Sequence, residues 1–168
     1  MKPRPRTQIP FSWPDPPLHL VLVEPDIPQN TGNIARLCAA TGTTLDLIEP
    51  LGFQLTDKLV KRAGLDYWDA VDVRRFPNLE NFQGEFSSVR KLYFSTSGTK
   101  SYTEANYQPG DCLIFGSESK GLPLELLEAN PDEVYNIPIQ LDHVRSLNLA
   151  NAASIVLYEA LRQINRTN

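Results

Sequence analysis

The sequence predicts a single α/β domain with a mainly parallel sheet flanked by helices. Short apolar runs bounded by proline or glycine alternate along the chain with segments whose apolar residues recur at helical spacing. This alternation is typical of parallel sheets, because each parallel connection has to cross from one end of the sheet to the other. The chain has 168 residues, of which 41% are hydrophobic, so it can bury one core. We place the domain at residues 18–168, after a proline-rich arm at residues 1–17 that holds six of the 14 prolines.

The first strand and the first helix carry clear local signals. Residues 18–25, LHLVLVEP, form a short apolar run that ends at a proline, as a buried strand does. Residues 30–42, NTGNIARLCAATG, place Ile34, Leu37 and Cys38 at helical spacing, and the glycine that ends the segment is a typical helix stop.

The later elements continue the same alternation. Residues 91–97 and 111–116 are predicted strands, and the helix predicted at 122–130 has Pro123 at its second position, where the first helical turn tolerates it. In chain order we expect strand 44–50, helix 57–64, strand 70–76, a weakly helical segment at 78–85, strands 91–97 and 111–116, helix 122–130, strand 133–138 and a long helix at 147–164.

The composition bears on several classes of protein. The chain has no apolar run of about 18 residues, and the arm lacks the apolar region of a signal peptide, so we expect a cytoplasmic protein that does not span a membrane. Cys38 and Cys112 stand far apart and the chain has only two histidines, so we expect free thiols and no metal site. The net charge of −4 does not by itself indicate a nucleic-acid-binding protein.

Three loops that follow predicted strands are the candidate functional segments. Ligands of parallel sheets bind beyond the carboxyl ends of the strands, which is where such loops lie. The loop after the first strand lacks the G-x-G-x-x-G pattern of dinucleotide-binding domains, and Ser117 and Ser119 have the wrong offsets for a G-x-S-x-G hydrolase. Each loop alone fits ordinary turn and cap chemistry. The three are PDIPQNTGNIAR (25–36), FGSESKGLP (115–123) and NIPIQLDHVRSLNLANA (136–152).

In combination, these loops resemble the three motifs of the SPOUT superfamily of RNA methyltransferases. The resemblance runs from about residue 18 to the C-terminus, and the segments IEPLGF and RAGLDYWD resemble the TrmL group of tRNA wobble-nucleotide 2′-O-methyltransferases. The resemblance implies the SPOUT fold, with a deep trefoil knot through which the C-terminal helix is threaded. General rules for chain connections would not predict a knot.

The resemblance also implies S-adenosyl-L-methionine as the cofactor and S-adenosyl-L-homocysteine as its product. Gly116 and Gly121 would allow close backbone approach or a positive φ in the second loop. One departure is Ala150, which stands where relatives often have serine and so removes one hydroxyl near the cofactor loop. The implied cofactor-binding residues are Phe94, Thr96, Gly116, Gly121, Ile137, Ser146 and Leu147.

For catalysis the resemblance implies a second set of residues. A sulfonium methyl is already a strong electrophile, so aligning it with the ribose 2′-oxygen can contribute on the order of 7–11 kcal/mol. Because a guanidinium resists deprotonation, we assign Arg36 to hold the adjacent phosphate and to stabilise negative charge developing on the oxygen. We expect Ser146 and Asn148 in the first turn of the last helix. The implied catalytic residues are Asn30, Arg36, Glu118, Ser146 and Asn148.

The implied substrate is tRNA, with the methyl group going to the ribose 2′-hydroxyl of nucleotide 34 in the anticodon stem-loop. Lys58, Lys61 and Arg62 share one helical face that fits either a solvated surface or a phosphate-tracking patch, and with Tyr158 they are our candidate RNA-binding residues. Two rival functions stay open: methylation of a base nitrogen, which would use a carboxylate as proton acceptor, and a binding module without turnover. Three roles stay open for the proline-rich arm: a disordered tail, a segment that contacts RNA, or a brace against the domain.

The last helix predicts an assembly as well. Its broad apolar face is enough to pack it on its own sheet, yet Ile155 and Tyr158 fall on a second stripe with Asn151 and Arg162. The resemblance implies a homodimer formed through this helix and the first one, with Arg36 close to or across the subunit boundary.

Overall fold

The computed structural model describes residues 6–56 and 67–167. The helix predicted at 57–64, and with it Lys58, Lys61 and Arg62, lies outside the described residues. Within them the chain forms a seven-stranded sheet in the order β3-β2-β1-β6-β4-β7-β5, and every pairing of these strands is parallel. The predicted fold class is confirmed.

The strands are short, as they are in most α/β domains. Each lies inside a predicted run except β5, a two-residue strand that pairs with β7 and that the sequence pattern did not indicate. The strands are β1 (His19–Val23), β2 (Thr44–Ile48), β3 (Val73–Phe76), β4 (Lys91–Phe94), β5 (Lys100–Ser101), β6 (Cys112–Phe115) and β7 (Val134–Asn136).

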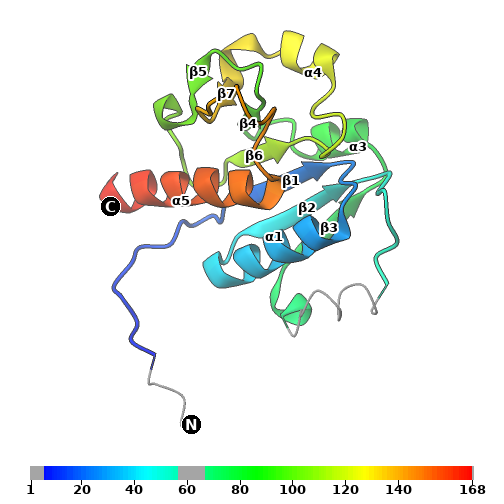
Figure 1. The fold of residues 1–168 in the computed structure, drawn as a ribbon. Helices are drawn as coiled ribbons and strands as arrows, with labels where there is room; N and C mark the ends of the chain where they lie inside the picture. The colour runs from blue at the N-terminus through cyan, green and yellow to red at the C-terminus, as the bar shows by residue number, and fades with distance from the viewer. Residues whose placement is uncertain (1–5, 57–66, 168) are drawn as a thin grey trace.

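Helices cover both faces of the sheet. α1 (Pro28–Thr41) and α5 (Leu149–Thr167) pack side by side against one face, while α3 (Leu79–Glu85) and α4 (Leu124–Glu128) contribute to the apolar cluster on the other (Figure 1). None of the helices in the described part of the chain is long and apolar enough to cross a membrane. Short 3₁₀ helices occur at Trp68–Ala70, Tyr102–Glu104 and Pro131–Glu133.

Several predicted boundaries are wrong by a few residues, and proline explains two of them. Helix α1 begins at Pro28, earlier than expected, because the fixed φ of proline suits the first helical position. Pro123 lies just before α4 and acts as its N-cap residue, so that helix begins at Leu124. Of the strand predicted at 70–76, Ala70 instead ends a 3₁₀ helix, and the strand itself begins only at Val73.

The core divides according to the two-residue period of the strands. In β1, Leu20 and Leu22 pack toward α1 and α5, whereas Val21 and Val23 pack toward α3 and α4. The predicted apolar face of α5 is buried, including Ala153, Val156 and Leu157. Strands that are buried on both faces have nearly continuous apolar sequences, and this pattern is what predicted them from the sequence.

The arm contacts the body of the domain near the end of α5. Phe11 packs against the core cluster and lies 4.6 Å from the Trp13 ring, centroid to centroid. The backbone N–H of Ser12 donates to the side-chain oxygen of Asn165 at 2.9 Å. Among the roles considered for the arm, these contacts favour a brace for residues 11–13.

Candidate active site

A cavity of about 770 Å³ lies beyond the carboxyl ends of β4, β6 and β7. The three loops that the sequence singled out meet there, as the position of ligand sites in parallel sheets leads one to expect. All seven expected cofactor-binding residues line the cavity, and so do four of the five expected catalytic ones. These are Phe94, Thr96, Gly116, Gly121, Ile137, Ser146 and Leu147, with Asn30, Glu118 and Asn148 beside them.

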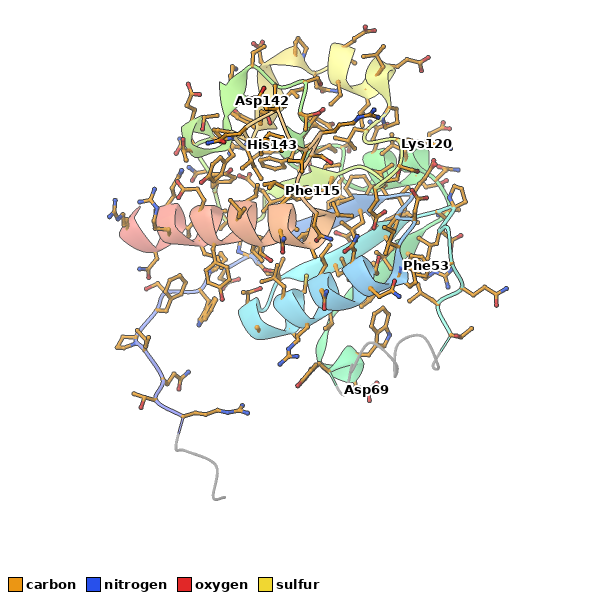
Figure 2. The ribbon with its side chains drawn as sticks, viewed as in Figure 1. Phe53, Asp69, Phe115, Lys120, Asp142 and His143 are labelled. Atoms are coloured by element: carbon orange, nitrogen blue, oxygen red, sulfur yellow. The ribbon has the colours of Figure 1, made fainter. Side chains whose placement is uncertain are left out.

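The floor of the cavity is aromatic. The rings of Phe94 and Phe115, which line it, stack with centroids 5.0 Å apart, and the Tyr135 ring packs behind them, 6.1 Å from Phe94 between centroids. Figure 2 shows Phe115 in the interior of the molecule and Lys120 at its edge, where the strands end. Sequence reasoning named Phe94 but missed Phe115, which ends its strand directly before the glycine-containing loop.

The loop from Gly116 to Gly121 is folded tightly upon itself. A Cβ atom on Gly116 would lie 2.0 Å from the backbone carbon of Gly121, so only glycine fits this approach. Gly121 has φ of +70°, and its N–H donates to the carbonyl of Ser117 at 2.9 Å. Both expected reasons for glycine therefore hold, one at each position.

Glu118 joins this loop to the start of α1. Its carboxylate accepts hydrogen bonds from the N–H of Asp26 at 2.7 Å and of Ile27 at 3.3 Å, and from the side-chain amide of Asn30 at 3.0 Å. A negative charge at a helix N-terminus is stabilised by the unpaired N–H groups there. Glu118 thus holds the two residues that lead into α1, at a helix start where the N-cap residue Ile27 makes no side-chain hydrogen bond.

Asn30 extends the network to the third loop. Its side-chain oxygen accepts from the amide of Asn148 at 3.0 Å. The side-chain oxygen of Asn148 in turn accepts from the N–H groups of Ala150 and Asn151, which is the geometry of an N-cap. The expectation that Ser146 and Asn148 lie in the first turn of the last helix is wrong, because α5 begins at Leu149 and both residues precede it.

A second set of hydrogen bonds, which sequence reasoning missed, joins the first loop to the glycine-containing loop. The carboxylate of Asp26 accepts from the N–H of Ser119 at 3.1 Å and also from its hydroxyl. Asp26 and Glu118 each bind backbone of the other loop, so the two segments are held reciprocally. Asp26 lies in the first of the three loops that the sequence singled out, but nothing in that segment identifies Ser119 as its partner.

Arg36 does not line the cavity. It is exposed on α1, and its guanidinium lies 5.1 Å from the centroid of the Tyr67 ring. Tyr158 is likewise exposed on α5 and outside the cavity. Ala150 is buried against the core rather than facing the cavity, so its missing hydroxyl removes nothing from the cavity wall.

The chemistry of the lining suits a nucleoside-sized ligand that brings its own reactive group. The volume lies within the range of small-molecule sites, and an aromatic floor with nearby backbone groups fits an adenosine moiety. Glu118, Lys120 and Arg145 are the ionisable side chains among the described lining residues, and Glu118 already accepts three hydrogen bonds. Within the described part of the chain, no group of three or more histidine, cysteine or acidic residues is placed to hold a metal ion.

Comparison with known proteins agrees with this geometry. A tRNA (cytidine(34)-2′-O)-methyltransferase of Saccharophagus degradans is 50% identical over 147 residues, which cover 87% of this chain and 95% of that protein. A solved structure described as giving insights into the 2-OH methylation of C/U34 on tRNA has a TM-score of 0.81 at 49% identity, covering 87% of this chain and 95% of that one.

A more distant structure carries the cofactor. The AdoMet-bound rRNA methyltransferase of Sinorhizobium meliloti has a TM-score of 0.77 at 29% identity and covers 87% of this chain and 56% of that one. The model of the SpoU rRNA methylase family matches residues 17–158. The resemblance stated from the three loops is confirmed, and the chain belongs to the SpoU rRNA methylase family.

Proposed function

We propose that this protein is an S-adenosylmethionine-dependent tRNA methyltransferase that methylates the ribose 2′-hydroxyl of nucleotide 34. The observation that carries the proposal is the cavity at which the three loops meet, tied together through Asn30, Glu118 and Asn148. The names of the relatives with about half of their residues identical support the substrate, and the AdoMet-bound family structure supports the cofactor.

The bound cofactor would supply an activated methyl group. Phe94 and Phe115 would hold its adenosine, while the backbone of the Gly116–Gly121 loop and of the segment at Ile137 would surround it. The protein's main task is then to align the ribose oxygen with the methyl group, which is an effect of positioning. The reciprocal Asp26 and Glu118 contacts keep these loops in place for that alignment.

Arg36 would act on the RNA. Its guanidinium cannot serve as a base, so it would hold a phosphate beside the ribose and stabilise charge that develops on the oxygen. Because Arg36 lies outside the cavity of its own chain, we propose that it reaches the site of the partner in a homodimer. The knotted threading of α5 and a place in the cytoplasm belong to the same proposal.

The hydrogen bonds that the Glu118 carboxylate already accepts favour methylation of the ribose over methylation of a base. A base-nitrogen methyltransferase would use a carboxylate as proton acceptor, but the only carboxylate among the described lining residues is occupied by donors from Asp26, Ile27 and Asn30. Methylation of the ribose places no such demand on Glu118.

The test uses an unmodified tRNA transcript and a matched transcript with 2′-deoxyribose at position 34. With methyl-labelled cofactor, the first should gain one methyl group, which nuclease digestion and mass spectrometry assign to the ribose of nucleotide 34. The second should gain none. Methylation of the deoxy substrate, or a methyl group found on the base, would contradict the proposal.

A further inference from the structure

Two cations at the mouth of the cavity have no partner within the described part of the chain. Lys120 and Arg145 both line the cavity and are exposed, and the side chain of neither makes a hydrogen bond or ion pair with a described residue. Most other described cations are matched. Partners are found for Arg74, Arg75, Arg90, Lys91, Lys100 and Arg162.

These two cations are poorly placed to serve the cofactor's reactive group. The sulfonium is itself positively charged, and a like charge nearby raises its energy. The carboxylate of Glu118 forms no ion pair with either cation, because its oxygens accept hydrogen bonds from Asp26, Ile27 and Asn30. Two unmatched positive charges beside a binding cavity instead complement a polyanion that arrives from solution. Lysine as a point charge and arginine as a planar fork both bind phosphate well.

The mouth also exposes two large apolar side chains. Ile27, just before α1, is 42% exposed, and Leu124, the first residue of α4, is 66% exposed. Both line the same cavity as the two cations. Apolar side chains beside a binding cavity suit an unpaired base in an RNA loop, because the face of such a base is flat and apolar.

We propose that Lys120, Arg145, Ile27 and Leu124 form a nucleotide subsite at the mouth of the cavity. Lys120 and Arg145 bind phosphates next to the ribose that is methylated, and Ile27 and Leu124 contact its base. This inference rests on the proposed function and deepens it, because it assigns residues of this chain to the phosphates and to the base of the target nucleotide.

The charge half of the subsite is tested with Lys120→Gln, Arg145→Gln and the double variant. Calorimetry measures the affinity for S-adenosylhomocysteine, and single-turnover methylation at several KCl concentrations measures the affinity for the tRNA transcript. Each single variant should bind tRNA about tenfold more weakly at low salt, with cofactor affinity unchanged. The slope of log affinity against log salt should fall by about 0.7 for each phosphate contact removed.

Arg74→Gln is the matched control. Arg74 lies on the edge strand β3, away from β4, β6 and β7, and its ion pairs to Asp72 and Glu85 are exposed. It should leave cofactor affinity, tRNA affinity and salt slope as in the wild type. A weaker affinity for the cofactor in Lys120→Gln or Arg145→Gln would assign these cations to the cofactor's carboxylate and overturn the subsite. An unchanged salt slope would overturn it as well.

The apolar half is tested with Leu124→Ser and an anticodon stem-loop that lacks the base at position 34. Wild type should bind the abasic RNA more weakly than the normal one, whereas Leu124→Ser should bind both equally weakly, and its salt slope should equal that of wild type. An equal loss in both proteins on removing the base would contradict the contact. If wild type methylates nucleotide 34 and all these variants match it, the subsite alone fails. If wild type does not methylate nucleotide 34, the proposed function fails and takes the subsite with it.

Discussion

The side-chain amide of Asn148 donates to the side-chain oxygen of Asn30 over 3.0 Å, although 118 positions separate the two in the chain. The side-chain amide of Asn30 also donates to the carboxylate of Glu118. The side-chain oxygen of Asn148 accepts from two N–H groups in the first turn of α5. The starts of α1 and α5 and the glycine-containing loop are therefore held by one set of hydrogen bonds.

Replacing Asn30 by aspartate should break this set at its centre. A carboxylate at position 30 would face that of Glu118 and lose the donor that now lies 3.0 Å away, and the site is buried. We expect a loss of about 1–3 kcal/mol in the free energy of unfolding and a weaker affinity for the cofactor. Denaturant titration and calorimetry measure the two effects.

The pH dependence of that loss identifies its cause. The like charge raises the folded-state pKa of the carboxyl pair, so the pair favours the native state only where it can hold a proton. The loss in the free energy of unfolding caused by Asn30→Asp should be small at acidic pH and complete at neutral pH. Asn33→Asp, at an exposed position of α1, should show little change. A deficit that is equal at all pH values would argue against carboxylate repulsion.

A methyl group added at Gly116 should damage the second loop directly. The new Cβ would meet the backbone of Gly121 and Leu122 at 2.0–2.2 Å, and backbone cannot move aside as a flexible side chain can. Gly116→Ala should therefore cost about 3 kcal/mol or more and abolish cofactor binding, both measurable on purified protein. The added methyl group would clash with the backbone of its own loop even when no cofactor is bound.

Gly84→Ala is the matched control for that substitution. Gly84 lies inside α3, and a Cβ there would meet nothing within 4 Å. Alanine should stabilise the protein by roughly 0.5–1 kcal/mol, since glycine is a poor helix former. Equal stabilities of the two alanine variants would contradict the steric argument.

The sequence located the site better than it described the contacts inside it. Runs such as CLIF mark strands, and the loops after them lie at the carboxyl edge of any parallel sheet, so Gly116 and Ile137 could be assigned to one cavity. No local pattern reveals that Asp26 binds Ser119, because the two are 93 positions apart and depend on strand order. The two-residue strand β5 could not be predicted from the sequence for the same reason, because it is defined by its pairing with β7.

Arg36→Ala should separate methyl transfer from cofactor binding. Arg36 lies outside the cavity and over the Tyr67 ring, so the cofactor's affinity should not change. If the guanidinium stabilises charge on the ribose oxygen, single-turnover methylation should fall by about 100-fold or more. Arg36→Lys should recover only part of this, since it keeps the charge but loses the fork. Weak cofactor binding with normal methylation at saturation would contradict the role.

The two cysteines should be inert in the folded protein. Both are buried, and burial followed by the nearby Asp46 charge raises the pKa of the Cys112 thiol to about 12 and that of Cys38 as well. An aromatic disulfide reagent at pH 8 should leave native protein unreacted and modify both thiols in guanidinium. An exposed cysteine introduced as Ser87→Cys should react at once. Fast modification of the native wild type would contradict this.

The same pKa values give a direction for stability in alkali. A thiol whose pKa is raised on folding supports the native state below its ordinary value of 9.0, and this support is lost as the pH rises toward 12. The free energy of unfolding should therefore fall above pH 9. Comparing wild type with Cys112→Ala over this range isolates the contribution of one thiol.

Helix α5 presents an outward stripe opposite its buried face. Ile155 is 37% exposed and Tyr158 is 53% exposed, and Asn151 and Arg162 lie on the same side. Helix α1, which carries Arg36, packs directly beside α5. A two-fold contact across these helices would cover the stripe and bring Arg36 toward the partner's cavity. Such an interface is self-complementary, so one substitution changes it twice.

Ile155→Asp should therefore split the dimer and abolish tRNA methylation together, because it places a carboxylate in the contact twice and the cation on the stripe, Arg162, is already paired with Glu159. Light scattering at micromolar concentration should give a dimer for wild type and a folded monomer for the variant, and circular dichroism checks the fold. Ile9→Asp is the matched control: Ile9 is 79% exposed on the arm, outside the stripe, and should remain dimeric and active. A wild type that is monomeric at this concentration and fully active, or an Ile155→Asp variant that stays dimeric, would remove the basis for placing Arg36 at the partner's site.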